Sequence, residues 1–226
     1  VYDTVAYGGK RIEINNVESI KISSNKKLMK QVFNTADVCT ADWWTNGDLK
    51  EWANDNFPIV AKHVHGSRGE GNTILYNLNQ LNAWLPNKTM GNYIFEKFYN
   101  YALEYRLHIT EDGCFYTCRK ALKSDTPEEE SWYRNDSNCV WLLESNPLFN
   151  KPNSWDDIVD DCVKALKAIG ADVLSFDVRV QSATKGNGKP REYQEYILLE
   201  CNSASSLSSE TSEISVVASK YIEMLP

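Results

Sequence analysis

Apolar side chains recur at helical spacing along residues 26–37, which predicts a helix with one buried face. Ser24 and Asn25 precede this stripe, and either side chain can cap a helix start. The apolar positions are Leu28, Met29, Val32, Phe33 and Ala36.

A longer stripe predicts a second helix over residues 154–169. Ser154 and Asp157 suit its start, and Gly170 suits its end, because glycine readily adopts the left-handed conformation that closes helices. Two further helices are predicted, over residues 77–85 and 213–225. The apolar positions of the long stripe are Trp155, Ile158, Val159, Cys162, Val163, Leu166 and Ile169.

Shorter apolar or alternating runs predict strands between these helices. The turn at residues 111–113 folds one run back onto the next, and the polar residues 182–192 join the last two runs. Hairpins interspersed with helices predict an α+β protein with largely antiparallel sheets rather than a doubly wound one. The predicted strands cover residues 57–62, 72–75, 93–98, 103–109, 114–122, 172–180 and 195–201.

Length, charge and cysteine content narrow the class of protein. At 226 residues the chain can bury a core, as one domain or as two intimate lobes. The net charge of −7 argues against general nucleic-acid binding, which needs clustered excess lysine and arginine. No apolar run approaches the roughly 18 residues of a membrane span. We therefore expect neither a nucleic acid nor a membrane as a partner. Six cysteines without a CxxC pair favour reduced thiols in a cytoplasmic protein.

The last predicted hairpin carries the strongest chemical signal. If its turn centres near Gly188, Asp177 and Glu200 lie almost opposite each other, and Asn202 follows on the same face. Two opposed carboxylates repel each other unless one is protonated or a cation lies between them. Carboxylate and amide oxygens are the hard ligands that Mg²⁺ prefers. The alternative is a solvated polar face on which Arg179 forms the salt bridge.

The stretch AKHVHGSRGEG, residues 61–71, places Lys62 on a predicted strand directly before a glycine-rich loop. The loop is neither a Walker loop nor a dinucleotide fingerprint, because no Gly-Lys-Ser/Thr closes it and the G-x-G-x-x-G spacing is missing. Successive backbone N–H groups in such a loop can still wrap a phosphate, and the lysine adds charge. The alternative is an ordinary turn.

Glu96 and Glu104 flank a break between two predicted strands. Backbone N–H and C=O groups at such a break are free to bind the edge of an adenine, and a carboxylate can hold ribose hydroxyls. The alternative is a surface crossover with two exposed glutamates.

In their order along the chain, these pieces resemble the ATP-grasp superfamily of ATP-dependent ligases. No single motif is specific, but their common order makes the resemblance specific. The matching segments, spread over residues 25–208, are SNKKLMKQVFNTADV, PIVAKHVHGSRGEG, YIFEKF, LEYRLHI, FDVRV and LLECNSASSLS.

The resemblance implies a role for each matching residue. The ATP phosphates would contact Lys26 and Lys62 and be closed over by Gly66, Ser67, Gly69 and Gly71. Adenine would be read, mainly through backbone, at Glu96, Lys97 and Phe98, and ribose would be bound by Glu104. Mg²⁺ would be held by Asp177, Glu200 and Asn202. Arg106 and Arg119 would be catalytic arginines near the transferred phosphate and the carboxylate substrate, and Arg179 is a third candidate catalytic residue.

The resemblance also implies a fold in which two α+β lobes, residues 24–98 and 99–226, sandwich ATP and Mg²⁺. A small-molecule or peptide carboxylate would attack the γ-phosphate to give an acyl phosphate and ADP, and an amine or similar nucleophile would then displace the phosphate. Family members carry a sizeable domain before the first lysine, whereas residues 1–23 form only a short segment, so part of the acceptor site is expected either to be missing or to come from a partner chain. The alternatives are a catalytically idle ATP-binding module of a larger assembly and a kinase that stops after phosphoryl transfer.

Overall fold

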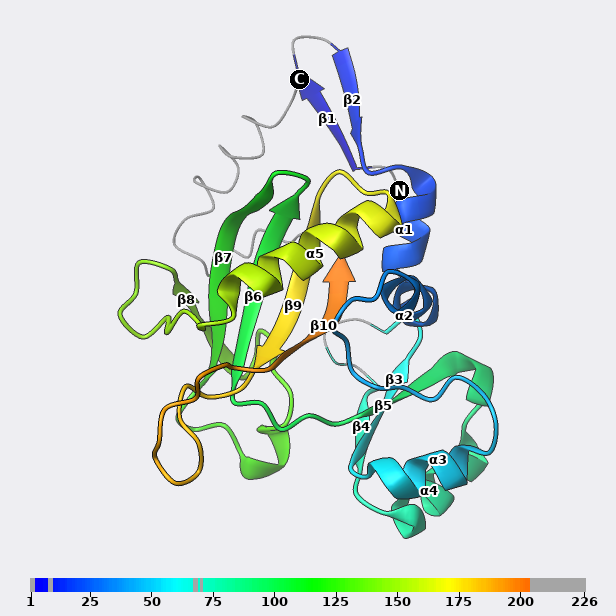
Figure 1. Ribbon diagram of the computed structural model, residues 1–226. Helices are drawn as coiled ribbons and strands as arrows, with labels where there is room; N and C mark the ends of the chain where they lie inside the picture. The colour runs from blue at the N-terminus through cyan, green and yellow to red at the C-terminus, as the bar shows by residue number, and fades with distance from the viewer. Residues whose placement is uncertain (1–2, 8–9, 67–68, 70, 204–226) are drawn as a thin grey trace.

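A five-stranded antiparallel sheet is the framework of the computed structural model, which describes residues 3–7, 10–66, 69 and 71–203 (Figure 1). Its strand order is β10-β9-β6-β7-β8, and every neighbouring pair is antiparallel, as the sequence predicted. Strand β8 was not predicted. The bounds are β6 Leu103–Thr110, β7 Gly113–Leu122, β8 Cys139–Leu143, β9 Leu174–Val180 and β10 Tyr196–Asn202.

Two helices, α2 (Lys26–Thr35) and α5 (Trp155–Ile169), bury their predicted apolar stripes against one face of this sheet. The Asn25 side chain accepts hydrogen bonds from two backbone N–H groups at the start of α2. Gly170 closes α5 with a φ of +72°, a left-handed conformation that suits glycine. Ser154 occupies the N-terminal cap position of α5, but its side chain forms no capping hydrogen bond.

A smaller, three-stranded antiparallel sheet lies beside the first, in the order β4-β3-β5 (Figure 1). Helices α3 and α4 pack on it around a separate apolar core. The sequence predicted all of these elements except α3. The bounds are α3 Leu49–Asn56, β3 Ile59–His63, β4 Thr73–Leu75, α4 Leu78–Trp84 and β5 Tyr93–Lys97, with single 3-10 turns at Leu85–Asn87, Met90–Asn92 and Glu128–Glu130.

The chain ahead of α2 forms a hairpin, β1 (Asp3–Tyr7) with β2 (Lys10–Ile14), and the short helix α1 (Val17–Ser23). The sequence pattern predicted none of these elements. Asn15 anchors this segment to the five-stranded sheet, because its side chain donates to the carbonyl oxygen of Val173 at 2.8 Å. The predicted helix over residues 213–225 lies outside the described residues.

The packing of α2 does not follow the proposed lobe boundary at residue 24. That boundary assigns α2 to the small lobe, yet Met29 and Phe33 are buried in the core of the five-stranded sheet with α5. The three-stranded sheet, α3 and α4 form the other core. Helix α2 therefore belongs by packing to the larger sheet, while its first residue reaches the smaller one.

The cysteines and the composition of the helices concern two further expectations of the sequence analysis, about reduced thiols and about membrane spans. All six cysteines are free, and Cys118, Cys139, Cys162 and Cys201 are buried, as expected of reduced core thiols, whereas Cys39 is exposed. Among the described helices, none combines the length and the apolar composition that crossing a membrane requires.

Candidate active site

A cavity of about 740 Å³, including its open mouth, lies between the two sheets. Its walls come from β3, β5 and the glycine loop on one side and from β6, β9, β10 and residues 132–134 on the other. The predicted site residues that line it are Lys26, Lys62, Gly69, Glu96, Lys97, Phe98, Glu104, Asp177, Arg179 and Glu200. Residues predicted from separate motifs are thus gathered at one place.

Lys26 and Lys62 reach the cavity from different elements. Lys26, the first residue of α2, has its ammonium 3.3 Å from Oε2 of Glu200. Lys62, on β3, donates a hydrogen bond of 2.6 Å to Oε2 of Glu96. Burial would raise the pKa of Glu96, but neighbouring lysines lower it, so this carboxylate is ionised.

The glycine-rich loop follows Lys62 and contacts the start of α2. The ammonium of Lys26 donates to the carbonyl oxygen of Gly66 at 2.6 Å. Gly69 and Gly71 have φ values of +78° and +73°, so the backbone there adopts the left-handed conformation that favours glycine. Ser67, also assigned to this loop, lies outside the described residues.

Asp177 lies on the buried polar face of the five-stranded sheet, with cations on β6, which is adjacent to its strand, and on β7, the next strand in the sheet. Arg106 on β6 donates two hydrogen bonds to it, at 2.8 and 2.9 Å, and Lys120 on β7 donates a third at 2.7 Å. Burial would raise the pKa of Asp177, but these two cations lower it. Asp177 is therefore held as a carboxylate.

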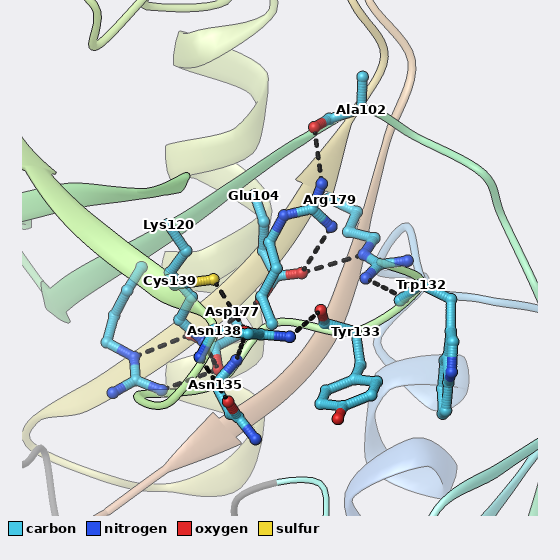
Figure 2. Close-up of polar contacts among 12 residues, drawn as sticks. Ala102, Glu104, Lys120, Trp132, Tyr133, Asn135, Asn138, Cys139, Asp177 and Arg179 are labelled. Atoms are coloured by element: carbon cyan, nitrogen blue, oxygen red, sulfur yellow. Dashed lines mark hydrogen bonds and ion pairs between the residues drawn. The ribbon is translucent and has the colours of Figure 1, made fainter. Parts of the chain in front are cut away.

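Glu104 binds a second group of cations beside the first (Figure 2). Its side chain accepts a hydrogen bond of 3.0 Å from Nε of Arg179 and lies 3.3 Å from Lys120 and 3.7 Å from Arg134. Burial would raise the pKa of Glu104, and these cations lower it. Lys120 links the two groups, because it also binds Asp177.

Residues 132–134 line the cavity, and Figure 2 shows Trp132 and Tyr133 beside the ion pairs of Glu104. Arg179 donates to the carbonyl oxygen of Trp132 at 2.6 Å, and Arg134 donates to that of Ala102 at 2.9 Å. The side-chain amide of Asn138 donates to the carbonyl oxygen of Tyr133 at 3.1 Å. The charged network thus holds an aromatic loop against the cavity.

The predicted magnesium ligands lie on adjacent strands. Glu200 is the register partner of Asp177, as predicted, because a β-bulge between Leu198 and Glu200 shifts the pairing by one residue. Asn202 follows on β10. Two carboxylates and an amide of this kind suit Mg²⁺. Among the described residues there is no group of three or more His, Cys, Asp or Glu side chains placed to hold a metal ion.

The alternative reading of this hairpin, a solvated face with Arg179 as the partner of Asp177, is wrong. Asp177 and Arg179 are 3% and 6% exposed, so their face is buried. Arg179 pairs with Glu104 on the neighbouring strand, whereas Asp177 pairs with Arg106 and Lys120. Glu96 and Glu104 are likewise buried, at 2% and 3%, which excludes a surface crossover with two exposed glutamates.

Arg119 was predicted as a catalytic arginine, and the structure places it away from the others. It is the register partner of Tyr105, whose ring is buried in the core between the five-stranded sheet and α5. Its guanidinium donates to the carbonyl oxygen of Leu148. Side chains alternate across a strand, so Arg119 and Lys120 point to opposite faces, and only Lys120 reaches Asp177.

The prediction that the backbone at the strand break is free to read adenine is wrong for two N–H groups. The N–H of Lys97 donates to the carbonyl oxygen of Asp42, and that of Phe98 donates to the carbonyl oxygen of Pro58, both at 2.8 Å. Both residues still line the cavity. These two N–H groups are therefore not free to donate hydrogen bonds to an adenine base.

Three cations of the site were missed in the sequence: Lys30, Lys120 and Arg134. Lys30 lies one helical turn after Lys26, a spacing that could have indicated a shared face. Lys120 could have been found by alternation on its strand, whereas Arg134 lies in an irregular loop and has no such signal.

Replacing Glu104 with glutamine is expected to lower the free energy of unfolding by about 3 kcal/mol, because it leaves buried cations without their carboxylate. Urea unfolding of wild type and variant measures this. Glu144→Gln is the matched control, since Glu144 forms a surface ion pair with Lys151 and should change stability by less than about 0.5 kcal/mol. Equal stability of both variants would show that the buried network contributes nothing.

Solved structures of known ligases resemble this chain in fold. A D-alanine–D-alanine ligase from Bacillus anthracis complexed with ATP matches with a TM-score of 0.64 and 16% identity over 93% of this chain. The ATP-grasp ligase PsnB complexed with a minimal precursor matches with a TM-score of 0.64 and 14% identity over 94%. An L-amino acid ligase from Bacillus licheniformis matches with a TM-score of 0.56 and 15% identity over 82%.

The chain spans only part of these proteins: 67% of the D-alanine–D-alanine ligase chain, 64% of PsnB and 41% of the L-amino acid ligase. In another structure of the Bacillus anthracis ligase it spans 59%. No protein-family model and no curated protein sequence matches the chain. At these identities the likeness concerns the fold.

Proposed function

We propose that this chain, which has the ATP-grasp fold, is an ATP-dependent ligase that binds Mg-ATP in the cavity between its two sheets. The observation that carries the proposal is the charge of the residues around that cavity. Among the described residues, seven cations and four carboxylates form the ion pairs around it, an excess of three positive charges in a chain of net charge −7. Such a local excess favours a polyanionic ligand.

Lys26, Lys62 and the glycine loop would hold the phosphates. Both lysines line the cavity at its junction with the loop. The left-handed backbone at Gly69 and Gly71 turns the loop tightly, which lets N–H groups approach a phosphate closely. Preformed cations at that point stabilise the charge that develops during phosphoryl transfer without reorganising.

Phe98 and Trp132 would flank the nucleobase. Both line the cavity, and their rings meet edge to face with centroids 6.5 Å apart. The carboxylate of Glu104 lines the same end of the cavity and would accept hydrogen bonds from ribose hydroxyls, in addition to its ion pairs. Arg179, which pairs with it, would position this carboxylate and the loop that carries Trp132.

Asp177, Glu200 and Asn202 would hold Mg²⁺, which supplies Lewis-acid stabilisation of phosphoryl oxygens when bound. Arg106, which is not among the residues that line the cavity, would position Asp177 through its two hydrogen bonds. Lys26, which lies 3.3 Å from Glu200, would keep that carboxylate compensated before the nucleotide arrives.

The substrates of this ligase would be an amino acid or peptide carboxylate and an amine. A carboxylate oxygen attacks the γ-phosphorus, the bond to the β-γ bridging oxygen breaks, and ADP leaves. The amine then attacks the acyl carbon, and inorganic phosphate leaves. Similar structures named as a D-alanine–D-alanine ligase, an L-amino acid ligase and an ATP-grasp ligase complexed with a minimal precursor support this class.

Release of ADP from Mg-ATP, measured against pooled amino acids and peptides, tests the proposal. We expect ADP release that needs a carboxylate and an amine together, with an amide product in the mass spectrum. Phosphorylated product without need for an amine would identify a kinase instead. Mg-ATP binding without turnover against any pool would identify an idle binding module.

A further inference from the structure

Lys30 is fully buried where the two sheets meet. Its ammonium donates a hydrogen bond of 2.6 Å to the hydroxyl of Thr40 and lies 3.2 Å from Oε1 of Glu96. The other oxygen of Glu96 accepts the hydrogen bond from Lys62 at 2.6 Å. Glu96 therefore lies between two lysines, one from α2 and one from β3.

The contacts of this lysine join both sheets. Its helix packs in the core of the five-stranded sheet, whereas Glu96 and Lys62 lie on the three-stranded one. The hydroxyl of Thr40 donates to the carbonyl oxygen of Leu198 at 2.7 Å, directly before the bulge that places Glu200. The buried ammonium thus connects the strand of a metal ligand with the lysine assigned to the phosphates.

A buried ammonium is a costly way to stabilise a fold. Burial lowers the pKa of Lys30, whereas the carboxylate of Glu96, 3.2 Å away, raises it, so the ion pair with Glu96 favours the charged ammonium. An apolar side chain of similar length would fill the same space without that cost. The position therefore indicates a role for which the charge is needed.

We propose that Lys30 is a positioning residue that keeps the charge of Lys62 available to the phosphates of ATP, a role that rests on the proposed function. With both lysines charged, Glu96 is shared between them, and the three residues carry one net positive charge. Without Lys30, Glu96 neutralises Lys62 alone, and the net charge is zero. The cavity then loses one positive charge at the point where the triphosphate binds.

Isothermal titration of Mg-ATP and of adenosine into wild type and variants tests this role. Lys30→Met is expected to weaken Mg-ATP binding by about tenfold or more and to change adenosine binding by less than about twofold. The double variant Lys30→Met/Glu96→Gln also removes the neutralising carboxylate, so it should recover most of the Mg-ATP affinity. Lys27→Met, at an exposed position of the same helix, controls for a general loss of charge.

Parallel losses of Mg-ATP and adenosine affinity, or a double variant that binds Mg-ATP no better than Lys30→Met, would overturn the role. A wild type that binds adenosine but gains nothing from the phosphates would overturn the proposed function, and this role with it. If Lys30→Met does not fold, Thr40→Val takes its place, because it removes only the hydroxyl that fixes the ammonium. We then expect an Mg-ATP affinity about threefold weaker than that of wild type, and equal affinities would overturn the role.

Discussion

Replacing Asp177 with asparagine is expected to lower the free energy of unfolding by about 3–5 kcal/mol and to abolish ATP-dependent activity. The side chain is 3% exposed and accepts hydrogen bonds from both Arg106 and Lys120. Removing its charge leaves the partly buried Arg106 without its carboxylate partner and leaves the buried Lys120 with Glu104 alone. Urea unfolding of the protein without nucleotide measures the change.

If Asp177 and Glu200 had no cations around them, Asp177→Asn would be expected to raise the free energy of unfolding, since removing one of two like charges relieves their repulsion. Because cations surround Asp177, we expect the free energy of unfolding to fall. Asp125→Asn, on the exposed surface, is the control and should change stability by less than about 0.5 kcal/mol. An Asp177→Asn protein as stable as wild type would show that the ion pairs of this carboxylate do not stabilise the fold.

The stability difference between wild type and Asp177→Asn is also expected to depend on pH. The neighbouring cations lower the folded-state pKa of Asp177 below its unfolded value of about 3.9. The stability that they confer is therefore fully present above about pH 4 and is lost as the pH falls through the folded-state pKa. Unfolding curves at neutral pH and below pH 4 should show the gap between the two proteins narrowing on acidification.

Replacing Glu200 with glutamine is expected to reduce ADP formation by about a hundredfold or more while leaving the fold intact. The side chain of Glu200 is 29% exposed, and its ion pair with Lys26 is 3.3 Å long. A single, partly exposed ion pair of this kind contributes about 1 kcal/mol or less to stability. The loss of a metal ligand therefore affects catalysis far more than unfolding.

Thermal melts with and without Mg-ATP separate these two effects of Glu200→Gln. We expect the variant to melt like wild type without ligand and to lose most of the stabilisation that Mg-ATP confers on wild type. Equal stabilisation of both proteins by Mg-ATP would contradict a metal-binding role for this carboxylate.

The pairing of Asp177 with Glu200 could be predicted because it is local: both strands belong to one hairpin, centred near Gly188. The bulge on β10 could not be seen in the sequence, yet the pairing depends on it. Continued without the bulge, the register that pairs Leu198 with Val178 would place Leu199 opposite Asp177. The prediction placed the turn only approximately, near Gly188, and the pairing that it gave happens to equal the register that follows the bulge.

The partners of these carboxylates could not be predicted, because they depend on which strands are neighbours. Arg106 and Asp177 are 71 residues apart, and only the pairing of β6 with β9 brings them together. The lysines at positions 30 and 120 are buried, whereas pattern analysis assigns lysines to the surface. Order and spacing of motifs therefore identified the fold and most of the cavity wall, but not its ion pairs.

A crystal structure of the protein with Mg²⁺ and a non-hydrolysable ATP analogue tests the proposed Mg-ATP site most directly. We expect a triphosphate in contact with Lys26 and Lys62, a metal ion bound by Asp177 and Glu200, and a base near Phe98. A nucleotide bound elsewhere on the molecule, or an empty cavity at saturating analogue and Mg²⁺, would contradict it.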